Sequence, residues 1–346
     1  MPGVTDLSAL GWTPDRDTEL PSGTEPGRVA RVDRGRLRVL TADGDRAAFL
    51  GAALHDGSGL GTPAVGDWVA LRDELAVALL PRRSAFVRTT AGRTSAAQVV
   101  AANLDVVLVV DSLSAEARLR RVERYLAVAW SSGATPVVVL TKSDLCDDVT
   151  AAVEQVAEDA LGVDVLPVSS LTGEGLDAVR ALLGPGRTAA MVGPSGVGKS
   201  SLANALAGRP LAGTREIRED GRGRHTTTAR ELHVLPGGGL LVDTPGMREL
   251  GLYDDEEGVA TAYADVTDLA GECRFRDCEH RTEPGCAVAA AIDDGRLDPG
   301  RLLGWRKLRA EAHRQLLRVD ARARAEEHAR MRRFSRSLKA QPNRLR

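Results

Sequence analysis

The residues with the clearest chemical role form a glycine-rich run that ends in lysine and serine. An apolar stretch precedes the run and helix-forming residues follow it, which is the context of a phosphate-binding loop. Glycines let successive backbone N–H groups point at phosphate oxygens, and the positive end of the helix adds to this field. We expect Lys199 to reach the β- and γ-phosphates and Ser200 to bind Mg²⁺. A chance glycine-rich turn is the alternative, but the strand and helix on either side favour a nucleoside triphosphate site. The run consists of Gly193, Pro194, Ser195, Gly196, Val197, Gly198, Lys199, Ser200 and Ser201.

Two further segments are candidates for contact with the γ-phosphate and its metal ion. Asp243 follows an apolar run and opens Asp-Thr-Pro-Gly, so its carboxylate would position Mg²⁺ and the Gly246 N–H would meet the γ-phosphate. Taken alone, these four residues could form an ordinary turn. Upstream, Thr226 and Thr227 end a charged loop, and a threonine hydroxyl there would bind Mg²⁺ once the γ-phosphate is present. We choose Thr227 for this role.

The residue that orients the attacking water must also come from this region. Ras-type enzymes use a glutamine directly after the Asp-x-x-Gly segment, whereas this chain has Met247. A thioether cannot position water, so another side chain has to do so, and His225 is the nearest candidate in the sequence. A solvated loop histidine is the alternative.

A third segment could select the base of the nucleotide. An aspartate at its end would accept hydrogen bonds from guanine N1–H and N2–H₂, which adenine does not offer, while the lysine stem would lie over the base. Helix capping by serine and aspartate is the alternative. At the next predicted strand end, two serines could offer backbone N–H groups to guanine O6. The segment consists of Thr141, Lys142, Ser143 and Asp144, and the serines are Ser169 and Ser170.

The order of these segments along the chain is unusual. In an ordinary GTPase the phosphate-binding loop comes first, whereas here Asp144 precedes Lys199 and Lys199 precedes Asp243. A circular permutation produces this order without changing the sheet, and domains with neighbouring termini tolerate it. The chain after Gly246 then leads directly into the C-terminal part, so nucleotide state could move that part.

Three cysteines and a histidine lie close together near the C-terminus. Their spacing fits a closed four-ligand structural zinc site that holds its segment folded without doing chemistry. Free buried cysteines with a surface histidine are the alternative. Cys146 is far away in the sequence and is not part of the set. The expected ligands are Cys273, Cys278, His280 and Cys286.

Length and charge indicate a protein of several domains with a polyanionic partner. The chain has 346 residues and a net charge of −2, but residues 91–300 carry 20 basic and 32 acidic residues. Residues 301–346 carry 15 basic and 4 acidic residues, an excess that favours phosphate contact over mere solubility. With 3% aromatic residues, binding to structured RNA should be mainly electrostatic.

The location expected from the sequence is the cytoplasm. No stretch has the roughly 18 apolar residues of a membrane span, and the first residues lack the pattern of a signal peptide. Four cysteines, three of them crowded together, do not form a secreted disulfide framework.

The pattern of elements predicts four parts. Residues 1–26 read as a loosely held arm, with Leu7, Leu10 and Trp12 as candidates for docking it. Residues 27–90 read as about five short antiparallel strands, an OB-fold-like or another small barrel. Residues 91–255 form an α/β domain with a parallel sheet, opened by a polar connection over 91–103. Residues 256–346 hold the cysteine set and a long amphipathic helix from Trp305 onward.

These features together resemble one family, the ribosome small-subunit-dependent GTPase A (RsgA) family. The resemblance extends from about residue 61 to residue 288, and it is specific because the permuted order and the cysteine–histidine set coincide. The segments that carry it read PAVGDWV, AANLDVVLVV, LTKSDL, GPSGVGKSSLANAL, GRHTTTARELH, DTPGMREL and CRFRDCEHRTEPGCAV.

The resemblance implies a fold, an activity and partners. It implies an N-terminal OB-fold, a circularly permuted P-loop GTPase domain and an α-helical zinc-binding C-terminal domain. It further implies GTP hydrolysis to GDP and phosphate, stimulated by the small ribosomal subunit, and a role in late maturation of that subunit through its rRNA. His225 would be the catalytic histidine, acting with Lys199 and Thr227, and we expect a monomer with one zinc ion and Mg²⁺-bound GTP.

Two positions depart from the family pattern, and three other functions compete. The base segment begins with Thr141 where Asn is commoner, which loses a side-chain amide that braces the loop, and Ser169-Ser170 replaces Ser-Ala. The competing functions are a P-loop ATPase or small-molecule kinase, a zinc-stabilised RNA-binding module with a regulatory nucleotide site, and a permuted GTPase of the large subunit.

Overall fold

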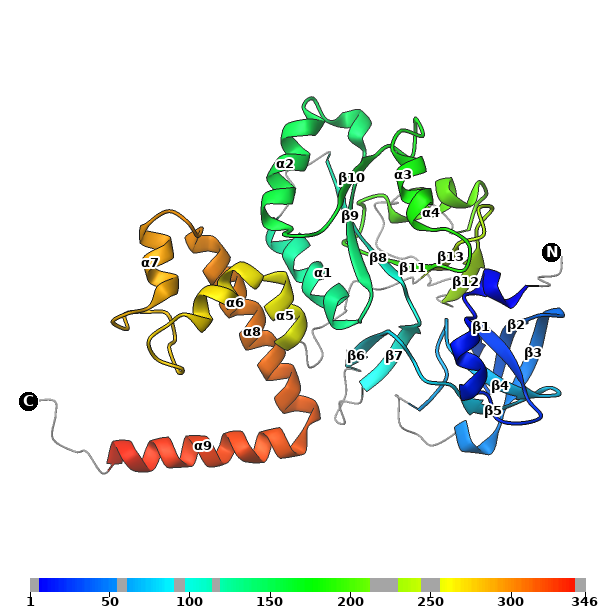
Figure 1. The fold of residues 1–346 in the computed structure, drawn as a ribbon, viewed down its shortest axis with the longest axis horizontal. Coiled ribbons are helices and arrows are strands. Elements are labelled where there is room, and N and C mark those ends of the chain that lie inside the picture. The colour runs from blue at the N-terminus through cyan, green and yellow to red at the C-terminus, as the bar shows by residue number, and fades with distance from the viewer. Residues whose placement is uncertain are drawn as a thin grey trace, which may run out of the picture.

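The computed structural model describes residues 6–54, 61–89, 97–113, 119–211, 230–243 and 256–339. Figure 1 shows three parts: a β-barrel near the N-terminus, a central sheet with helices, and a group of helices at the C-terminus. The last helix, α9, extends away from the rest of the molecule.

Five strands form the closed barrel that the strand pattern predicts. The order is β1-β2-β3-β5-β4, and pairing of β1 with β4 closes it. The expectation that all strands are antiparallel is wrong for β3 and β5, which pair in parallel. Alternating residues such as Val29, Leu37 and Val39 fill its interior, because successive side chains of a strand point to opposite faces. The strands are β1 (Glu25–Asp33), β2 (Arg36–Thr41), β3 (Gly44–Leu50), β4 (Trp68–Arg72) and β5 (Leu75–Leu79).

The central sheet has five parallel strands in the order β10-β9-β8-β11-β13. β8 and β11 are buried along their whole length, which explains why their sequences are apolar without alternation. The strands are β8 (Val106–Ser112), β9 (Thr135–Thr141), β10 (Val165–Val168), β11 (Thr188–Val192) and β13 (Leu240–Asp243).

Helices cover both faces of this sheet, as the alternating pattern predicts. One core cluster includes residues of α1 and α2, and the other includes residues of α3 and α4. These helices are α1 (Leu119–Ser131), α2 (Val149–Asp159), α3 (Leu176–Leu182) and α4 (Lys199–Ala207), and a short 3₁₀ turn, η4, spans Ser143–Leu145.

Two pairings connect the barrel with the central sheet. The antiparallel strand β12 (Glu231–Val234) lies between β13 and β1, so barrel and central strands form one continuous sheet. The guanidinium of Arg38 also pairs with the Glu231 carboxylate across this junction. Arg28 of β1 adds a further connection. It is buried and donates to the Asn103 carbonyl oxygen and to the hydroxyl of Thr188 in β11, each over 3.0 Å.

The prediction of a polar connection over residues 91–103 is wrong for the second half of this range. β7 (Ala97–Ala102) pairs with β6 (Ala85–Thr89) as an antiparallel hairpin. Val99 and Val100 are buried there because the hairpin packs between the barrel and the central sheet. The sequence alone places this short strand in a connection, because its pairing with β6 lies outside the alternating pattern of strands and helices.

The prediction that the N-terminal arm is loosely held is also wrong for the part of the arm that the structure describes. Two short 3₁₀ helices, η1 (Leu7–Leu10) and η2 (Pro14–Glu19), pack against the barrel. Leu10 is fully buried, and the Trp12 ring meets Trp68 edge to face with centroids 4.8 Å apart. Arg16 donates to the Asn103 side chain over 2.9 Å. The polar N-terminal sequence therefore contains a few residues whose buried contacts anchor it to the barrel.

The C-terminal part is helical, and its long helix is interrupted. The single helix expected from Trp305 onward is instead two helices that meet at Asp320, whose backbone is extended. The Asp320 carboxylate accepts from the N–H groups of Arg322 and Ala323, which caps the second helix. The helices are α5 (Glu256–Ala262), α6 (Ala264–Gly271), α7 (Ala287–Asp293), α8 (Pro299–Val319) and α9 (Ala321–Lys339).

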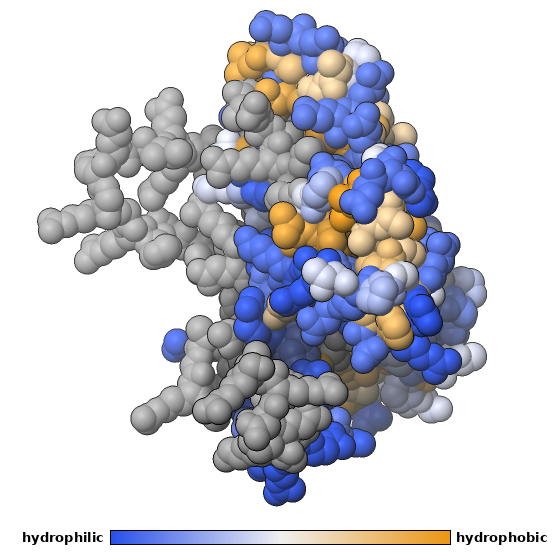
Figure 2. Space-filling model, turned by 90° about the vertical axis from the view of Figure 1, so that its left-hand side faces the viewer, coloured by the Kyte–Doolittle hydropathy of each residue, from blue (hydrophilic) through white to orange (hydrophobic). Residues whose placement is uncertain are grey.

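The side of the molecule that carries these helices is mainly hydrophilic, with smaller apolar patches (Figure 2). Among the described helices, none combines the length and the apolar character needed to span a bilayer.

Candidate nucleotide-binding site and metal centre

The glycine-rich loop connects β11 to α4 at the carboxyl edge of the parallel sheet. Ligands of open α/β sheets bind at this edge, where β11 lies between β8 and β13. Gly193 has a φ of +143°, and a Cβ there would lie 2.1 Å from the Val110 carbonyl oxygen. Gly198 precedes α4 with a φ of +96°. Only glycine fits the first position, which lets the loop pass tightly over the end of β8.

The ammonium group of Lys199 lies inside this loop. Its Nζ donates to the Gly193 carbonyl oxygen over 2.7 Å and to the Pro194 carbonyl oxygen. Lys199 is half-buried, while Ser195 and Ser200 are exposed at the mouth of the loop. A positive charge therefore lies beside the α4 N-terminus, where backbone N–H groups favour an anion.

The base-reading segment ends β9 beside this loop, and the structure brings its parts together. Lys142 has a left-handed backbone with a φ of +60°, and its Nζ donates to the Gly196 carbonyl oxygen over 3.2 Å. The buried Ser169 hydroxyl donates to Asp144 Oδ1 over 2.5 Å, which links the two predicted base contacts. The Asp144 side chain is exposed, so its remaining oxygen is accessible to a ligand.

The other serines of this region have a different environment. The hydroxyls of Ser143 and Ser170 are buried without a hydrogen-bond partner among the described residues. Ser169, in contrast, also accepts from the N–H groups of Leu171 and Thr172. The chain around Ser169 is thus organised by its side chain, whereas Ser170 contributes only backbone.

The departure at Thr141 does not remove the brace that an asparagine amide would provide. The Thr141 hydroxyl lies within hydrogen-bonding distance of the Val197 carbonyl oxygen in the glycine-rich loop. The asparagine amide is absent, as the sequence shows, and a shorter side chain makes a contact between the two loops.

Several predicted site residues lie outside the described part of the chain. They are His225, Thr226, Thr227 and Gly246. For Asp243 the backbone is described: it ends β13, the neighbour of β11, and pairs with Glu231 of β12. The carboxyl edge of β13 therefore lies next to the strand that leads into the glycine-rich loop.

An ion pair that was not predicted from the sequence lies at the same edge. Asp111 is 2% exposed at the end of β8, and its two oxygens accept from Arg121 of α1, with Nη2–Oδ1 at 2.7 Å and Nε–Oδ2 at 3.2 Å. The pair holds the start of α1 against the sheet. The feature of the sequence that could have indicated this pair is an aspartate directly after an apolar run that predicts a buried strand.

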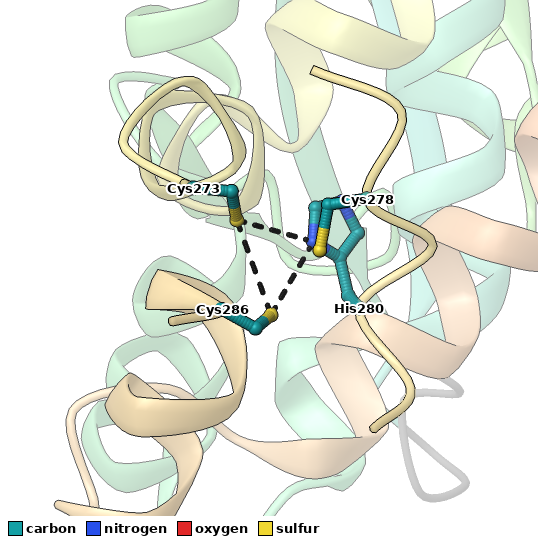
Figure 3. Close-up of side chains that lie close together, drawn as sticks. All are labelled: Cys273, Cys278, His280 and Cys286. Atoms are coloured by element: carbon teal, nitrogen blue, oxygen red, sulfur yellow. Dashed lines mark hydrogen bonds between the residues drawn. The ribbon is translucent and has the colours of Figure 1, made fainter. Parts of the chain in front are cut away.

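The four predicted metal ligands converge, as Figure 3 shows. Their ligand atoms all lie within 4.8 Å of one another. The Cys273 and Cys286 sulfurs are 3.9 Å apart, and His280 Nδ1 is 3.5 Å from the former and 3.6 Å from the latter. A tetrahedral zinc ion separates two thiolates by about 3.8 Å and a thiolate and an imidazole by about 3.5 Å. The cluster therefore fits one zinc ion.

Hydrogen bonds from several elements fix this cluster. The Glu283 carboxylate accepts from its own backbone N–H and from those of Arg281, Glu279 and Thr282, and these bonds lower its pKa to about 2. Arg306 of α8 donates to the carbonyl oxygens of Glu279 and His280. Burial lowers the pKa of the His280 imidazole, which keeps it in the neutral form that metals bind.

Comparison with known proteins identifies the family. The model of the RsgA GTPase family matches residues 79–253, which is half of the chain. The chain belongs to the RsgA GTPase family. Members of the family hydrolyse GTP.

Curated relatives of the RsgA GTPase family match over most of their length. A protein of Streptomyces coelicolor named small ribosomal subunit biogenesis GTPase RsgA is 50% identical over 333 residues, 92% of this chain and 90% of its own. A protein of Listeria innocua with the same name, numbered 1, is 44% identical over 288 residues, 82% of this chain and 83% of its own.

Solved structures support the fold. YjeQ from Thermotoga maritima has a TM-score of 0.63 and 25% identity, covering 84% of this chain and 98% of its own. YloQ, described as a circularly permuted GTPase, has a TM-score of 0.59 and 23% identity, covering 84% of this chain and 96% of its own. The OB-like barrel, the permuted α/β domain and the cysteine–histidine cluster predicted from the sequence are thereby confirmed.

A buried arginine joins the C-terminal helices of this RsgA GTPase to the central domain. Arg301 of α8 is 4% exposed and pairs with Glu123 of α1 and Asp265 of α6. Its Nη1 also donates to the Asp159 carbonyl oxygen at the end of α2. The Tyr263 hydroxyl donates to the second Glu123 oxygen over 2.7 Å. This junction was not predicted from the sequence, because no local pattern distinguishes Arg301 from the other arginines of the chain.

Proposed function

We propose that this GTPase binds the small ribosomal subunit through its rRNA and assists its late maturation, with GTP turnover stimulated by the subunit. The observation that carries the proposal is the 50% identity, over 92% of the chain, to a protein named small ribosomal subunit biogenesis GTPase. The joined base and phosphate loops supply the nucleotide site such a protein needs.

Within the cleft, we assign guanine to Asp144, supported by Ser169, with the Lys142 stem over the base. Residues 193–201 and Lys199 would bind the phosphates. Backbone N–H groups and the lysine ammonium would stabilise the charge that spreads over the transferring phosphoryl group. Because these donors belong to the loop and α4, they are in place before the reaction starts.

We assign Mg²⁺ to Ser200, Thr227 and Asp243. These residues would hold the ion, which would supply positive charge to offset the negative charge of the transferring phosphoryl group. Thr226 and Gly246 complete the group that would contact the γ-phosphate. His225 would hold the attacking water, because Met247 cannot.

We assign one structural zinc ion to Cys273, Cys278, His280 and Cys286, as the spacing of their ligand atoms supports. In such closed sites, metal binding contributes directly to folding. Zinc would hold the segment between α6 and α7, which has little secondary structure of its own.

Contact with rRNA would come from the barrel, the zinc-binding part and the basic helices α8 and α9. Along α9 the side chains of Arg324, Arg332 and Arg333 are exposed, and clustered arginines favour phosphate backbones. The limits of the domains, at residues 26, 90 and 255, stay predictions. The monomeric state and the cytoplasmic location also stay predictions.

The proposal predicts slow intrinsic turnover that rises with small subunits. We expect small ribosomal subunits to raise phosphate release by about tenfold or more, since contact with the subunit would position the attacking water. His225→Ala should lower the stimulated rate by about 100-fold and leave GTP affinity nearly unchanged. The measurement is phosphate release under saturating GTP, with affinity from titration of a fluorescent GTP analogue.

Large subunits and buffer alone are the controls. Equal stimulation by large subunits, or a rate that no subunit changes, would contradict the proposed partner. A His225→Ala variant that turns over like the wild type would reject the assigned role of this histidine while leaving the partner intact.

A further inference from the structure

One buried asparagine makes hydrogen bonds to several parts of the chain where the barrel meets the central domain. Asn103 is 7% exposed and connects β7 with β8. Its Oδ1 accepts from Arg16 Nη2 of η2 over 2.9 Å and from the Arg83 N–H over 3.0 Å. Its Nδ2 donates over 3.1 Å to the carbonyl oxygen of Gly66, shortly before β4 of the barrel. The amide side chain therefore connects the N-terminal arm, the barrel and the central domain.

The backbone of Asn103 adds two further bonds. Its N–H donates to the Ser84 carbonyl oxygen over 2.8 Å, and its carbonyl oxygen accepts from the buried Arg28 of β1. The backbone is left-handed, with a φ of +52°, a conformation that asparagine adopts more readily than most residues. The position thus needs a short side chain that tolerates this conformation and both donates and accepts, and asparagine combines these properties.

The pairing of β1 with β12 holds the barrel less firmly. Among the described residues, the two strands pair at one position, Arg31 opposite Glu231. The ion pair of Arg38 with Glu231 beside it is partly exposed on both sides, and such pairs contribute little free energy. In contrast, a turn of the barrel would leave the buried amide of Asn103 and its partners without hydrogen bonds, which is costly.

We propose that Asn103 is a positioning residue that fixes the barrel and the N-terminal arm on the central domain, so that the barrel and the basic helices α8 and α9 bind one partner at a set separation. This inference rests on the proposed binding of the small ribosomal subunit. When two binding surfaces are held at the right separation, the second contact forms without a further ordering cost. A barrel that is free to turn loses this advantage.

The position of Asn103 separates this role from catalysis. Asn103 precedes the amino end of β8, whereas the glycine-rich loop lies at the carboxyl edge of the sheet. Asn103→Gly keeps the left-handed backbone and removes only the side chain. We expect its turnover without subunits to stay within about twofold of the wild type. The concentration of small subunits that gives half of the maximal phosphate release should rise by about tenfold or more.

Hydrogen exchange followed by mass spectrometry measures the junction itself, without any partner. The Gly66 N–H donates to the Val29 carbonyl oxygen over 2.8 Å, and the Ala102 N–H donates to the Val65 carbonyl oxygen over 2.9 Å. Both groups should exchange about tenfold faster in Asn103→Gly, because the junction opens more often. The N–H groups of β2, inside the barrel, should keep their wild-type rates.

Two further variants serve as a control and as a milder change. Thr41 is fully buried within the barrel, and its hydroxyl donates to the Gly44 carbonyl oxygen over 3.0 Å. Thr41→Val should lower the melting temperature and change neither the exchange at Gly66 nor the half-saturating subunit concentration. Asn103→Asp keeps both acceptor bonds and loses the donor to Gly66, so it should show smaller changes in the same direction. It provides the test if Asn103→Gly does not fold.

The inference is overturned if the junction exchanges at the wild-type rate in the Asn103 variants. It is equally overturned if the junction exchanges faster while the half-saturating subunit concentration stays unchanged, since Asn103 would then only stabilise the fold. A wild type that does not respond to small subunits would instead refute the proposed function, and the exchange rates would still decide whether Asn103 fixes the barrel.

Discussion

At the scale of single residues, the proposed guanine site depends on how one carboxylate is held. Asp144 is exposed in the middle of η4, and an exposed carboxylate on a short turn can rotate freely. The Ser169 hydroxyl fixes one of its oxygens, and Ser169 is itself held by two backbone N–H groups. The bond thus links the two segments that the sequence places 25 residues apart, and it orients the other Asp144 oxygen for a ligand.

Removal of this hydroxyl should affect guanine binding selectively. We expect Ser169→Ala to weaken GDP binding by about 5- to 20-fold, because the carboxylate loses a charge-assisted hydrogen bond. Ser170→Ala is the matched control: its hydroxyl is buried without a partner among the described residues, so its loss should have little effect. Calorimetric titration with GDP measures both. Equal affinity of the two variants would mean that Ser169 does not orient Asp144.

At the scale of elements, α1 connects the nucleotide edge of the sheet with the C-terminal helices. Its first turn is held by Arg121 on Asp111, while Glu123 faces Arg301 and Arg124 pairs with Glu311 of α8. The Arg301 guanidinium also lies over the Tyr263 ring, 4.6 Å from its centroid. A charge buried this deeply is tolerated because several acceptors surround it.

The buried junction should dominate the stability of this contact. We expect Arg301→Met to lower the free energy of unfolding by about 3–5 kcal/mol, since it leaves Glu123 charged and buried. Arg124→Met removes the half-exposed pair with Glu311 and should cost about 1 kcal/mol or less. Urea denaturation followed by circular dichroism compares the two.

Adding Glu123→Gln to Arg301→Met should restore part of the loss, because the uncompensated charge is then gone. If the double variant is as unstable as the sum of the single ones, the two side chains do not act as a pair. If Arg301→Met costs no more than Arg124→Met, the junction is not the main contact between α1 and α8.

At the scale of the whole molecule, charge is distributed unevenly along the three parts. Residues 91–300 are acidic and residues 301–346 are strongly basic. α9, which carries many of these arginines, extends away from the other helices (Figure 1). Asp320 separates α8, which packs on the central domain, from α9, so the basic helix presents its charges to the outside. This arrangement suits binding to a polyanion.

Arginines of α9 should therefore contribute to the salt dependence of RNA binding. We expect the double variant Arg332→Gln and Arg333→Gln to bind small subunits more weakly. Its plot of log affinity against log salt should be shallower by about 0.7–0.9 per arginine that contacts phosphate. Arg187→Gln with Arg209→Gln removes the same charge from the exposed surface of the central domain and is the control. Identical salt slopes for the two double variants would exclude α9 from the contact.

The sequence by itself determined the chemistry and most of the elements. The glycine-rich loop, the Thr141–Asp144 segment and the cysteine–histidine set were identified because each needs particular residue types at fixed local spacing. The parallel strands were identified because burial on both faces requires continuous apolar runs. The barrel was predicted with its five strands, whereas the pairing of β1 with β4 that closes it is seen only in the structure.

Only the tertiary structure decided how distant segments meet. The buried anchors of the N-terminal arm, the β6–β7 hairpin, the break at Asp320 and the Arg301 junction depend on partners that are remote in the sequence. The connection from Thr141 to Val197 spans 56 residues. Local patterns cannot encode such contacts, because the value of a polar side chain depends on which donor or acceptor the fold places beside it.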